Sequence, residues 1–316
     1  MNNANLIQEW IDWLGRVRNS RGATLDAYYR TLTAFRQFAN EQLWDEIDAD
    51  TIERFMGRPR RGGIAPSPAT QDRDRIAIST FYKYLISRGL VVDNPVTNVG
   101  VPKVRNRQPK AIPDDVWTQL WSAPLAREDR VWLGLSCFAG LRRRELVSVG
   151  PRHFVLDTAT INHLERKGGG TYPVEYGEMA KVISNGLPHL LPDVDSWLAD
   201  VEWLVNYRRE RGGIVLIPFD TPASELTRFR ASLDDEWTPD PACINRRLKQ
   251  VLRRSGLPQT LFSPHALRHT CATNLMRCGV PLEIAADQLS HASIETTRRY
   301  LQTGGQLAQW RKQSFG

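Results

Sequence analysis

Three groups of polar residues in the second half of the chain have the types and spacing that chemistry needs. They are Arg142 with Glu145, His265 with Arg268, and His291 with Tyr300. A guanidinium group is permanently charged and can bind two oxygens of a phosphate at once. A histidine can take up or release a proton near neutral pH, and a tyrosine hydroxyl can act as a nucleophile. Taken singly, however, each residue has an ordinary structural explanation as a surface cation, a hydrogen-bonded histidine or a core tyrosine.

The elements expected around these residues would present them in defined directions. Gly140 follows an apolar helix and permits a tight turn into the next helix. Ser263 and Pro264 are typical of the cap and the first position of a helix. His265 and Arg268 lie three residues apart in that helix and would project from one face.

The hydrophobic pattern predicts a mainly α protein with two domains and one small antiparallel sheet. We expect a helical domain over residues 1–98, a basic linker over 99–112, and a larger mixed domain over 113–316 that ends in a tail. In the first domain the helices are expected over 6–18, from a cap at Thr24, over 50–56, and from Pro68 to about Gly89. The apolar face of the last of these is expected to consist of Ile76, Phe81, Tyr82 and Leu85.

The second domain is expected to begin with helices near 113–122 and 129–139. Residues 152–176 alternate like strands, with a turn at Thr158-Ala159 and a hairpin tip at 166–170. Pro173 lacks an N–H group and favours an edge strand. Helices are expected to resume at about 194 and to be interrupted around 212–241.

The charge of the chain is concentrated towards its N-terminal third. The whole chain has 42 Lys and Arg against 35 Asp and Glu, and residues 1–110 hold 17 of the former and 12 of the latter. The linker carries four cations and no acidic residue. This excess favours a polyanionic partner, with nucleic acid as the first candidate, although a high charge alone is also compatible with an ordinary globular protein.

Several classes of protein are excluded by what the sequence lacks. It has no run of about 18 apolar residues that would cross a membrane, and its first residues do not read as a secretory signal. Its four cysteines lack the spacing of a disulfide framework or a zinc site. No nucleotide-binding glycine motif is found. We therefore expect buried free thiols in a reducing cytoplasm.

Taken together and in this order, the polar groups resemble the motifs of the tyrosine recombinase (phage integrase) family. The match rests on Gly140-Leu141-Arg142-x-x-Glu145, on His265-x-x-Arg268, and on His291 followed nine residues later by Tyr300. The hairpin lysine that corresponds best is Lys167. The family commonly has Leu-Gly-His where this chain has Leu289-Ser290-His291, and an acidic residue where this chain has Ala266.

The resemblance implies a reaction in which Tyr300 attacks a phosphate of the DNA backbone and forms a 3′-phosphotyrosine. Negative charge on the non-bridging oxygens would be stabilised by Arg142, Arg268 and His291. His265 would act as general acid or base, because a phenol with a pKa of about 10 needs help to lose its proton. The implied role of Lys167 is to protonate the departing 5′ oxygen, and that of Glu145 is to orient the site.

The resemblance also implies double-stranded DNA as substrate and a homo-tetramer on paired DNA sites. It further implies a reaction that needs neither metal nor cofactor, and a cytoplasmic protein that is nucleoid-associated when bound to DNA. The N-terminal domain and the linker would clamp the duplex through its phosphates, with the expected contacts at Arg58, Arg60, Arg61, Lys103, Arg105 and Arg107. The tail with Leu307 and Trp310 would dock on a neighbouring protomer. Site-specific recombination is the preferred function, and the alternatives are a type IB topoisomerase and a non-catalytic DNA-binding protein on the same scaffold.

Overall fold

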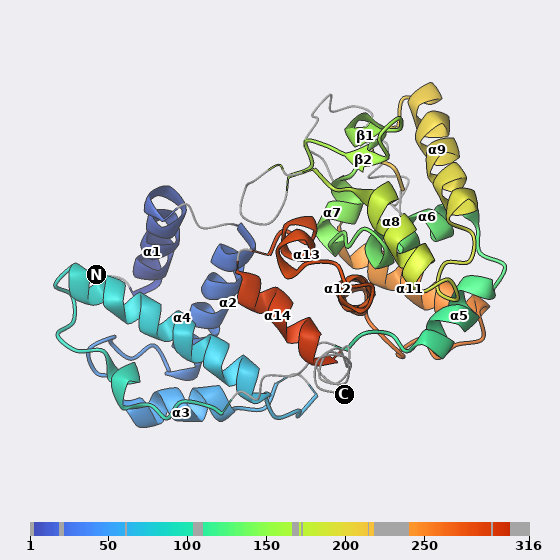
Figure 1. Cartoon of the computed structure of the whole chain (residues 1–316). Helices are drawn as coiled ribbons and strands as arrows, with labels where there is room; N and C mark the ends of the chain where they lie inside the picture. Colours follow the sequence, from blue (N-terminus) through green and yellow to red (C-terminus); the bar gives the residue numbers. More distant parts are fainter. Residues whose placement is uncertain are drawn as a thin grey trace. The chain divides into compact units, whose positions relative to one another are not determined.

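The computed structural model describes residues 3–18, 22–60, 62–103, 110–165, 171, 173–213, 215–217, 240–291 and 293–303 (Figure 1). The chain divides into two compact units, Met1–Asn106 and Arg107–Gly316. The described part is mainly helical and holds one two-stranded antiparallel sheet, which confirms the predicted fold class. None of its helices has the length and apolar character that a membrane crossing requires.

The N-terminal unit is built from helices packed around an aromatic core. Its elements are α1 (Asn3–Val17), α2 (Gly22–Phe38), α3 (Ala49–Gly57), α4 (Pro68–Ser87) and the 3-10 helix η1 (Pro95–Asn98). Asp48 caps α3 and Ser67 caps α4 through their side chains. The largest buried rings are those of Trp10, Phe35, Phe55, Phe81 and Tyr82. They meet in tilted and edge-to-face pairs.

Two details of this unit differ from the sequence expectation. Helix α2 begins at Gly22, so that Thr24 lies inside the helix and is not its cap. Ile76 is 43% exposed, whereas Ile78 is fully buried on α4. The assignment of Ile76 was wrong because the buried stripe runs through Ala77, Ile78 and Phe81, and Ile76 lies to one side of it.

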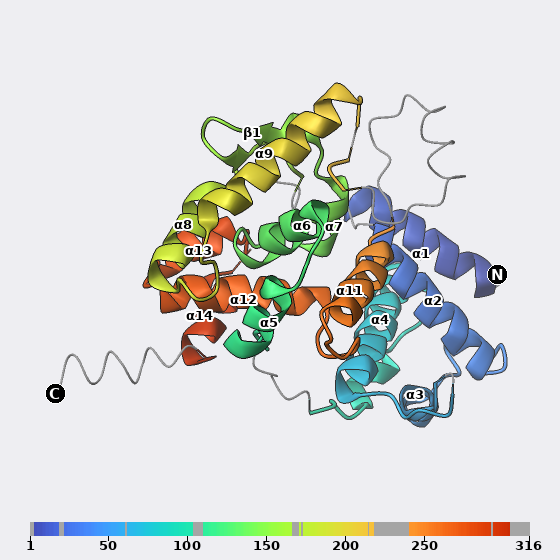
Figure 2. The same ribbon diagram turned by 90° about the vertical axis from the view of Figure 1, so that its right-hand side faces the viewer.

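The C-terminal unit surrounds one central helix. Its helices are α5 (Asp114–Ser122), α6 (Arg127–Cys137), α7 (Arg143–Ser148), η2 (Pro151–His153), α8 (Tyr176–Gly186), α9 (Val194–Glu210), α11 (Ala242–Arg254), α12 (Pro264–Arg277), α13 (Leu282–Gln288) and α14 (Ile294–Thr303). Helix α12 packs against α6, α8, α11, α13 and α14 (Figure 2). Ten of its residues are buried. This helix carries His265 and Arg268 and therefore anchors their backbone in the densest part of the unit.

The sheet of this unit is short. Strands β1 (Phe154–Val155) and β2 (Thr160–Ile161) pair antiparallel, with Phe154 opposite Ile161. Val174 forms an isolated antiparallel bridge to Ile161. The predicted turn at Thr158-Ala159 lies between the two strands, and Ala159 has a positive φ of 49°.

Helix α8 is missing from the sequence expectation, which placed strands up to residue 176 and helices from 194. Its buried residues Tyr176, Met179, Ala180 and Ile183 follow the spacing of one helical face. Gly177 is needed there, because an added Cβ would lie 2.4 Å from the Cβ of Ala159. The pattern was therefore present in the sequence, but the preceding strand pattern obscured it.

The predicted linker is anchored at both ends. Val99 is buried in the core of the N-terminal unit, and the N–H of Gly100 donates to Glu53 Oε1 over 3.0 Å. Ile112 is buried in the C-terminal unit, and its N–H donates to Thr270 Oγ1 of α12 over 2.8 Å. The residues between them that carry the predicted contacts Arg105 and Arg107 lie outside the described part of the chain.

Candidate active site

Arg268 is a buried guanidinium at the centre of the C-terminal unit. It is 2% exposed and donates to the carbonyl oxygens of Gly140 and Leu289. Pro264 occupies the first turn of α12 as predicted, and Ser263 stands at the N-cap position in an extended conformation. The side chain of Ser263 makes no capping hydrogen bond, so the predicted side-chain cap is wrong.

The turn between α6 and α7 requires a glycine at position 140. Gly140 has a φ of +74°, which side chains disfavour. In addition, a Cβ at this position would lie 2.5 Å from Leu289 Cδ2. The carbonyl of Gly140 is an acceptor for Arg268, so the same residue reverses the chain and holds the buried guanidinium.

Arg142 is the N-cap residue of α7 and is held by Glu145. The buried carboxylate of Glu145 accepts from Arg142 Nη1 over 2.8 Å and from the Arg142 backbone N–H over 2.7 Å. The second of these contacts is half of a capping box. Arg143 and Arg144 are exposed. The geometry therefore singles out Arg142 among the three consecutive arginines.

Both arginines converge on the turn after α13. Arg142 Nη2 donates to Leu289 O over 3.1 Å and to Ser290 O over 2.8 Å, while Arg268 also donates to Leu289 O. A single buried carbonyl thus holds two guanidiniums that are 126 positions apart in the chain. Two permanent cations at one point create the positive potential that a phosphate needs.

The residue between Leu289 and His291 adopts an unusual conformation. Ser290 has a φ of +44°, in the left-handed region that favours glycine. This explains in physical terms why a glycine suits the position. The hydroxyl oxygen of Ser290 is buried, and no described group forms a hydrogen bond with it. We did not predict a special role for Ser290, although its departure from the Leu-Gly-His pattern was visible.

His291 is oriented by a residue that sequence reasoning missed. Its Nδ1 lies 2.7 Å from Thr297 Oγ1, and its backbone N–H donates to Ala286 O. Thr297 is fully buried on α14, three residues before Tyr300. The backbone of Tyr300 lies in α14, and its side chain is not among the described groups. The helix that carries the predicted nucleophile therefore also supplies the partner of His291.

His265 lies in the first turn of α12, next to His269. Their rings are 4.2 Å apart in an edge-to-face arrangement. Partial burial, followed by the charges of Arg268, Arg142 and Arg143, lowers the pKa of His265. Burial, together with His265 and Arg268, lowers the pKa of His269 to about 4. These surroundings favour a neutral imidazole, which can accept a proton.

The remaining predicted residues are placed less completely. Lys167, Arg61, Arg105 and Arg107 lie outside the described residues. Lys103 is exposed at the start of the linker. Arg58 and Arg60 both contact Asp74, as described below.

Metal-binding chemistry has no visible site in the described part. No group of His, Cys, Asp or Glu side chains there is arranged to hold a metal ion. None of the four cysteines forms a disulfide, and burial raises the pKa of the thiols of Cys137, Cys243 and Cys278.

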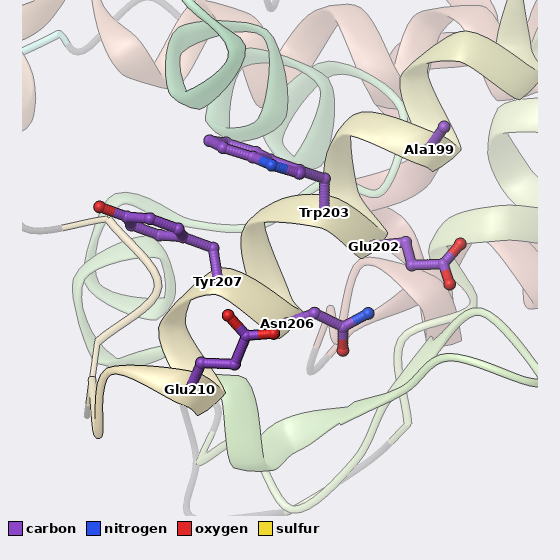
Figure 3. A pocket seen from close by; sticks show the side chains of 6 residues that line it. All are labelled: Ala199, Glu202, Trp203, Asn206, Tyr207 and Glu210. Carbon is purple, nitrogen blue, oxygen red and sulfur yellow. The ribbon is translucent and has the colours of Figure 1, made fainter.

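A separate hollow lies on one face of α9 (Figure 3). The rings of Trp203 and Tyr207 stack there with centroids 5.3 Å apart. The six lining residues all belong to α9, and none of them is a predicted catalytic residue. The polar groups described above, and not this hollow, define the candidate active site.

Comparison with known proteins gives consistent results for both units. Residues 7–89 match the family described as "Phage integrase, N-terminal SAM-like domain", and residues 241–305 match the "Phage integrase family". Tyrosine recombinase XerC of Chromohalobacter salexigens is 29% identical over 286 residues, which cover 88% of this chain and 85% of that protein. Tyrosine recombinase XerD of Caulobacter vibrioides is 27% identical over 295 residues, which cover 90% and 87%.

Solved structures show the same fold. Lambda integrase bound to DNA superimposes with a TM-score of 0.64 at 15% identity, over 96% of this chain and 97% of that one. The Tn1549 transposon integrase in complex with a circular intermediate DNA gives a TM-score of 0.64 at 14% identity, over 98% and 99%. The likeness extends through both units and is not confined to one of them.

Proposed function

Because this chain belongs to the tyrosine recombinase (phage integrase) family, we propose that it is a site-specific DNA recombinase that cuts and rejoins DNA through a 3′-phosphotyrosine. The observation that carries this proposal is the convergence of Arg142 and Arg268 on the Leu289 carbonyl, next to His291. Strand exchange by way of a Holliday junction serves integration, excision or the resolution of dimers.

The proposed first step transfers a phosphoryl group to the protein. The Tyr300 oxygen forms a bond to phosphorus, the bond to the 5′ oxygen breaks, and the DNA is left with a free 5′-hydroxyl. The 5′-hydroxyl of another strand reverses the step and regenerates the phenol. Because the phosphodiester energy is kept in the phosphotyrosine, the exchange needs no external energy source.

The proposed roles of the arginines follow from where their donors point. Fixed carbonyls and Glu145 hold the guanidiniums before DNA arrives, so that little reorganisation is needed when charge builds up on the phosphate oxygens. The backbone carbonyls orient Arg268 without neutralising it. Glu145 orients Arg142 and neutralises part of its charge. His291 adds a hydrogen bond to the same phosphate in this proposal.

Two further residues handle protons in this proposal. The lowered pKa of His265 keeps its imidazole neutral at neutral pH, which suits acceptance of the Tyr300 proton. Lys167 donates a proton to the departing 5′ oxygen. A balanced step thus uses one proton acceptor and one proton donor on the protein.

Duplex DNA is the proposed partner. The solved structures of lambda integrase and the Tn1549 integrase contain DNA, which supports this choice for a chain of the same fold. The proposed backbone contacts are Arg58, Arg60, Arg61, Lys103, Arg105 and Arg107. We further propose a homo-tetramer on paired sites, with the tail after residue 303 docked on a neighbour, in the cytoplasm and at the nucleoid.

Trapping the covalent intermediate tests the reaction. We expect a nicked suicide duplex that carries the target site to yield a protein–DNA adduct with the wild type and none with Tyr300→Phe. Joined strands from two different duplexes would distinguish recombination from the strand relaxation of a type IB topoisomerase. Absence of the adduct with every duplex tested, including duplexes recovered with the protein from cells, would support the non-catalytic alternative.

A further inference from the structure

A small hollow in the N-terminal unit gathers four arginines around one carboxylate. Arg30 comes from α2, Arg58 and Arg60 from the connection between α3 and α4, and Arg73 and Asp74 from α4. All five residues belong to one compact unit, so the hollow does not depend on the rest of the chain.

Small side chains on α2 create the space. Ala27, Thr31 and Ala34 line the hollow and follow the spacing of one helical face, the same face that carries Arg30. A long or bulky side chain at any of these three positions would fill it. This face of α2 therefore lines the hollow with small side chains and places the Arg30 guanidinium beside them.

The charges of the hollow are not balanced. Arg58 and Arg60 contact the same oxygen of Asp74, with 3.7 Å between Arg58 Nη1 and Oδ2. The Asp74 side chain is only 4% exposed. Neither Arg30 nor Arg73 forms an ion pair with a carboxylate in the described part of the chain. Four cations and one anion leave a formal surplus of three positive charges.

Two of these cations show the consequences of crowding. Arg58 lies over the Phe55 ring, with its guanidinium carbon 3.2 Å from the ring centroid. Burial, followed by the charge of Arg60, lowers the pKa of Arg58 to about 10, and Asp74 offsets this only in part. Arg60 Nε is buried and has no acceptor among the described groups. A buried donor without an acceptor costs free energy that an anionic oxygen would recover.

We propose that this hollow is a preformed site for one phosphate of the DNA backbone, with Arg30, Arg60 and Arg73 as its donors and Asp74 as the positioning residue. The choice of a phosphodiester rests on the proposed function, because DNA is the polyanion that such a protein binds. Guanidiniums are permanently charged, and the surplus of three positive charges in the hollow attracts the oxygens of a phosphate. Arg58 contributes charge but is held on Phe55.

A pair of neighbouring arginines on α4 provides the test. Arg73→Gln removes a proposed donor, whereas Arg75→Gln removes an equal charge that is bound to Asp72 over 2.9 Å and does not line the hollow. Affinity for duplex DNA is measured against KCl concentration, after thermal melting shows that both variants are folded. Arg73→Gln, and more strongly Arg30→Gln with Arg73→Gln, is expected to weaken binding several-fold. Loss of the whole phosphate contact lowers the salt slope by about 0.9.

Inorganic phosphate tests whether the hollow binds a phosphate of the DNA backbone or the free phosphate anion. Its effect on the melting temperature of the wild type and the double variant is compared with that of chloride at equal ionic strength. A lower salt slope of DNA binding in the double variant supports the proposal, whether or not phosphate raises the melting temperature of the wild type. A phosphate effect without a change on DNA assigns the site to the free anion and overturns it. Equal slopes for the double variant and Arg75→Gln also overturn it.

This test is independent of the reaction. Capture of DNA on Tyr300 uses residues of the C-terminal unit, whereas the salt slope and the phosphate effect report on the N-terminal hollow. An adduct with unchanged slopes would refute the phosphate site and leave the recombinase intact, and changed slopes without an adduct would do the opposite.

Discussion

Arg268 in the C-terminal unit is a buried guanidinium and Arg60 in the N-terminal unit is a half-buried one, and their acceptors differ. Arg268 donates to two backbone carbonyls, those of Gly140 and Leu289. Arg60 shares one carboxylate oxygen with Arg58, and its Nε has no acceptor among the described groups. The backbone carbonyls direct Arg268 and are themselves uncharged, whereas Arg60 contacts a carboxylate within a group of four cations.

The difference corresponds to what catalysis and binding each require. Backbone dipoles fix the direction of a guanidinium without cancelling its net charge, so they prepare it for one transition-state geometry. A surplus of cations attracts a phosphate from many directions but specifies none of them closely. The comparison therefore predicts that exchange of arginine for lysine matters greatly at position 268 and little in the N-terminal hollow.

The largest expected effect is that of Arg268→Lys. Lysine keeps the charge but lacks the planar fork that reaches both carbonyls, so the rate of adduct formation should fall by about 10²–10³. Single-turnover cleavage at saturating DNA measures it. Arg143→Lys, at an exposed neighbouring cation, is the matched control and should keep the rate.

Arg73→Lys completes this comparison in the N-terminal unit. The salt slope of DNA binding should stay within about 0.3 of the wild-type value, because a point charge suffices there. A small loss of rate in Arg268→Lys together with a large loss of slope in Arg73→Lys would invert the comparison and refute it.

A smaller effect is expected at Thr297. Thr297→Val removes the hydroxyl that lies 2.7 Å from His291 Nδ1 and with it the contact that orients this side of the ring. We expect the rate at saturating DNA to fall on the order of 10-fold, with unchanged DNA affinity, because a misdirected donor loses part of its effect on the transition state. Thr297→Ser should restore most of the rate and the shape of its pH profile.

Thr296→Val controls for the loss of a hydroxyl at the neighbouring position of α14. If Thr296→Val slows cleavage as much as Thr297→Val, or if Thr297→Ser fails to restore it, the contact with His291 does not position the ring.

The smallest effect is one of stability, at Ser290. Glycine would relieve the left-handed conformation and remove the unpaired buried hydroxyl, at some entropic cost, for a net gain of about 1 kcal/mol. For a unit of this size that gain corresponds to a rise in melting temperature of roughly 2–4 °C. Ser290→Ala removes the hydroxyl but keeps the strain, and should gain less. A melting temperature for Ser290→Gly below that of Ser290→Ala would contradict the strain.

The comparison of these regions also shows what could be predicted from the sequence. The family and the recombinase activity were predicted from motif order, and the fold class was predicted from the hydrophobic pattern; all three are confirmed. The meeting of Arg142, Arg268 and His291 was implied by the resemblance, because the motifs lie on helices of one unit. The roles of the individual residues stay predictions.

Other features could not be predicted because they depend on contacts between distant segments. The pairing of His291 with Thr297 requires the chain to turn between α13 and α14, and nothing in the residue types specifies that turn. The same holds for the stacking of Arg58, an expected phosphate contact, on the ring of Phe55. Helix α8 was missed for another reason. Its helical period is present in the sequence, but the strand pattern just before it obscured that period.

Gly140 and Leu289 fit together so closely that an added Cβ at position 140 would strike the leucine side chain. Their carbonyls hold Arg268, so this close fit maintains the architecture on which the candidate site is built. A substitution at Arg142 leaves the fit untouched, and such a chain can therefore keep its fold after the proposed chemistry is lost.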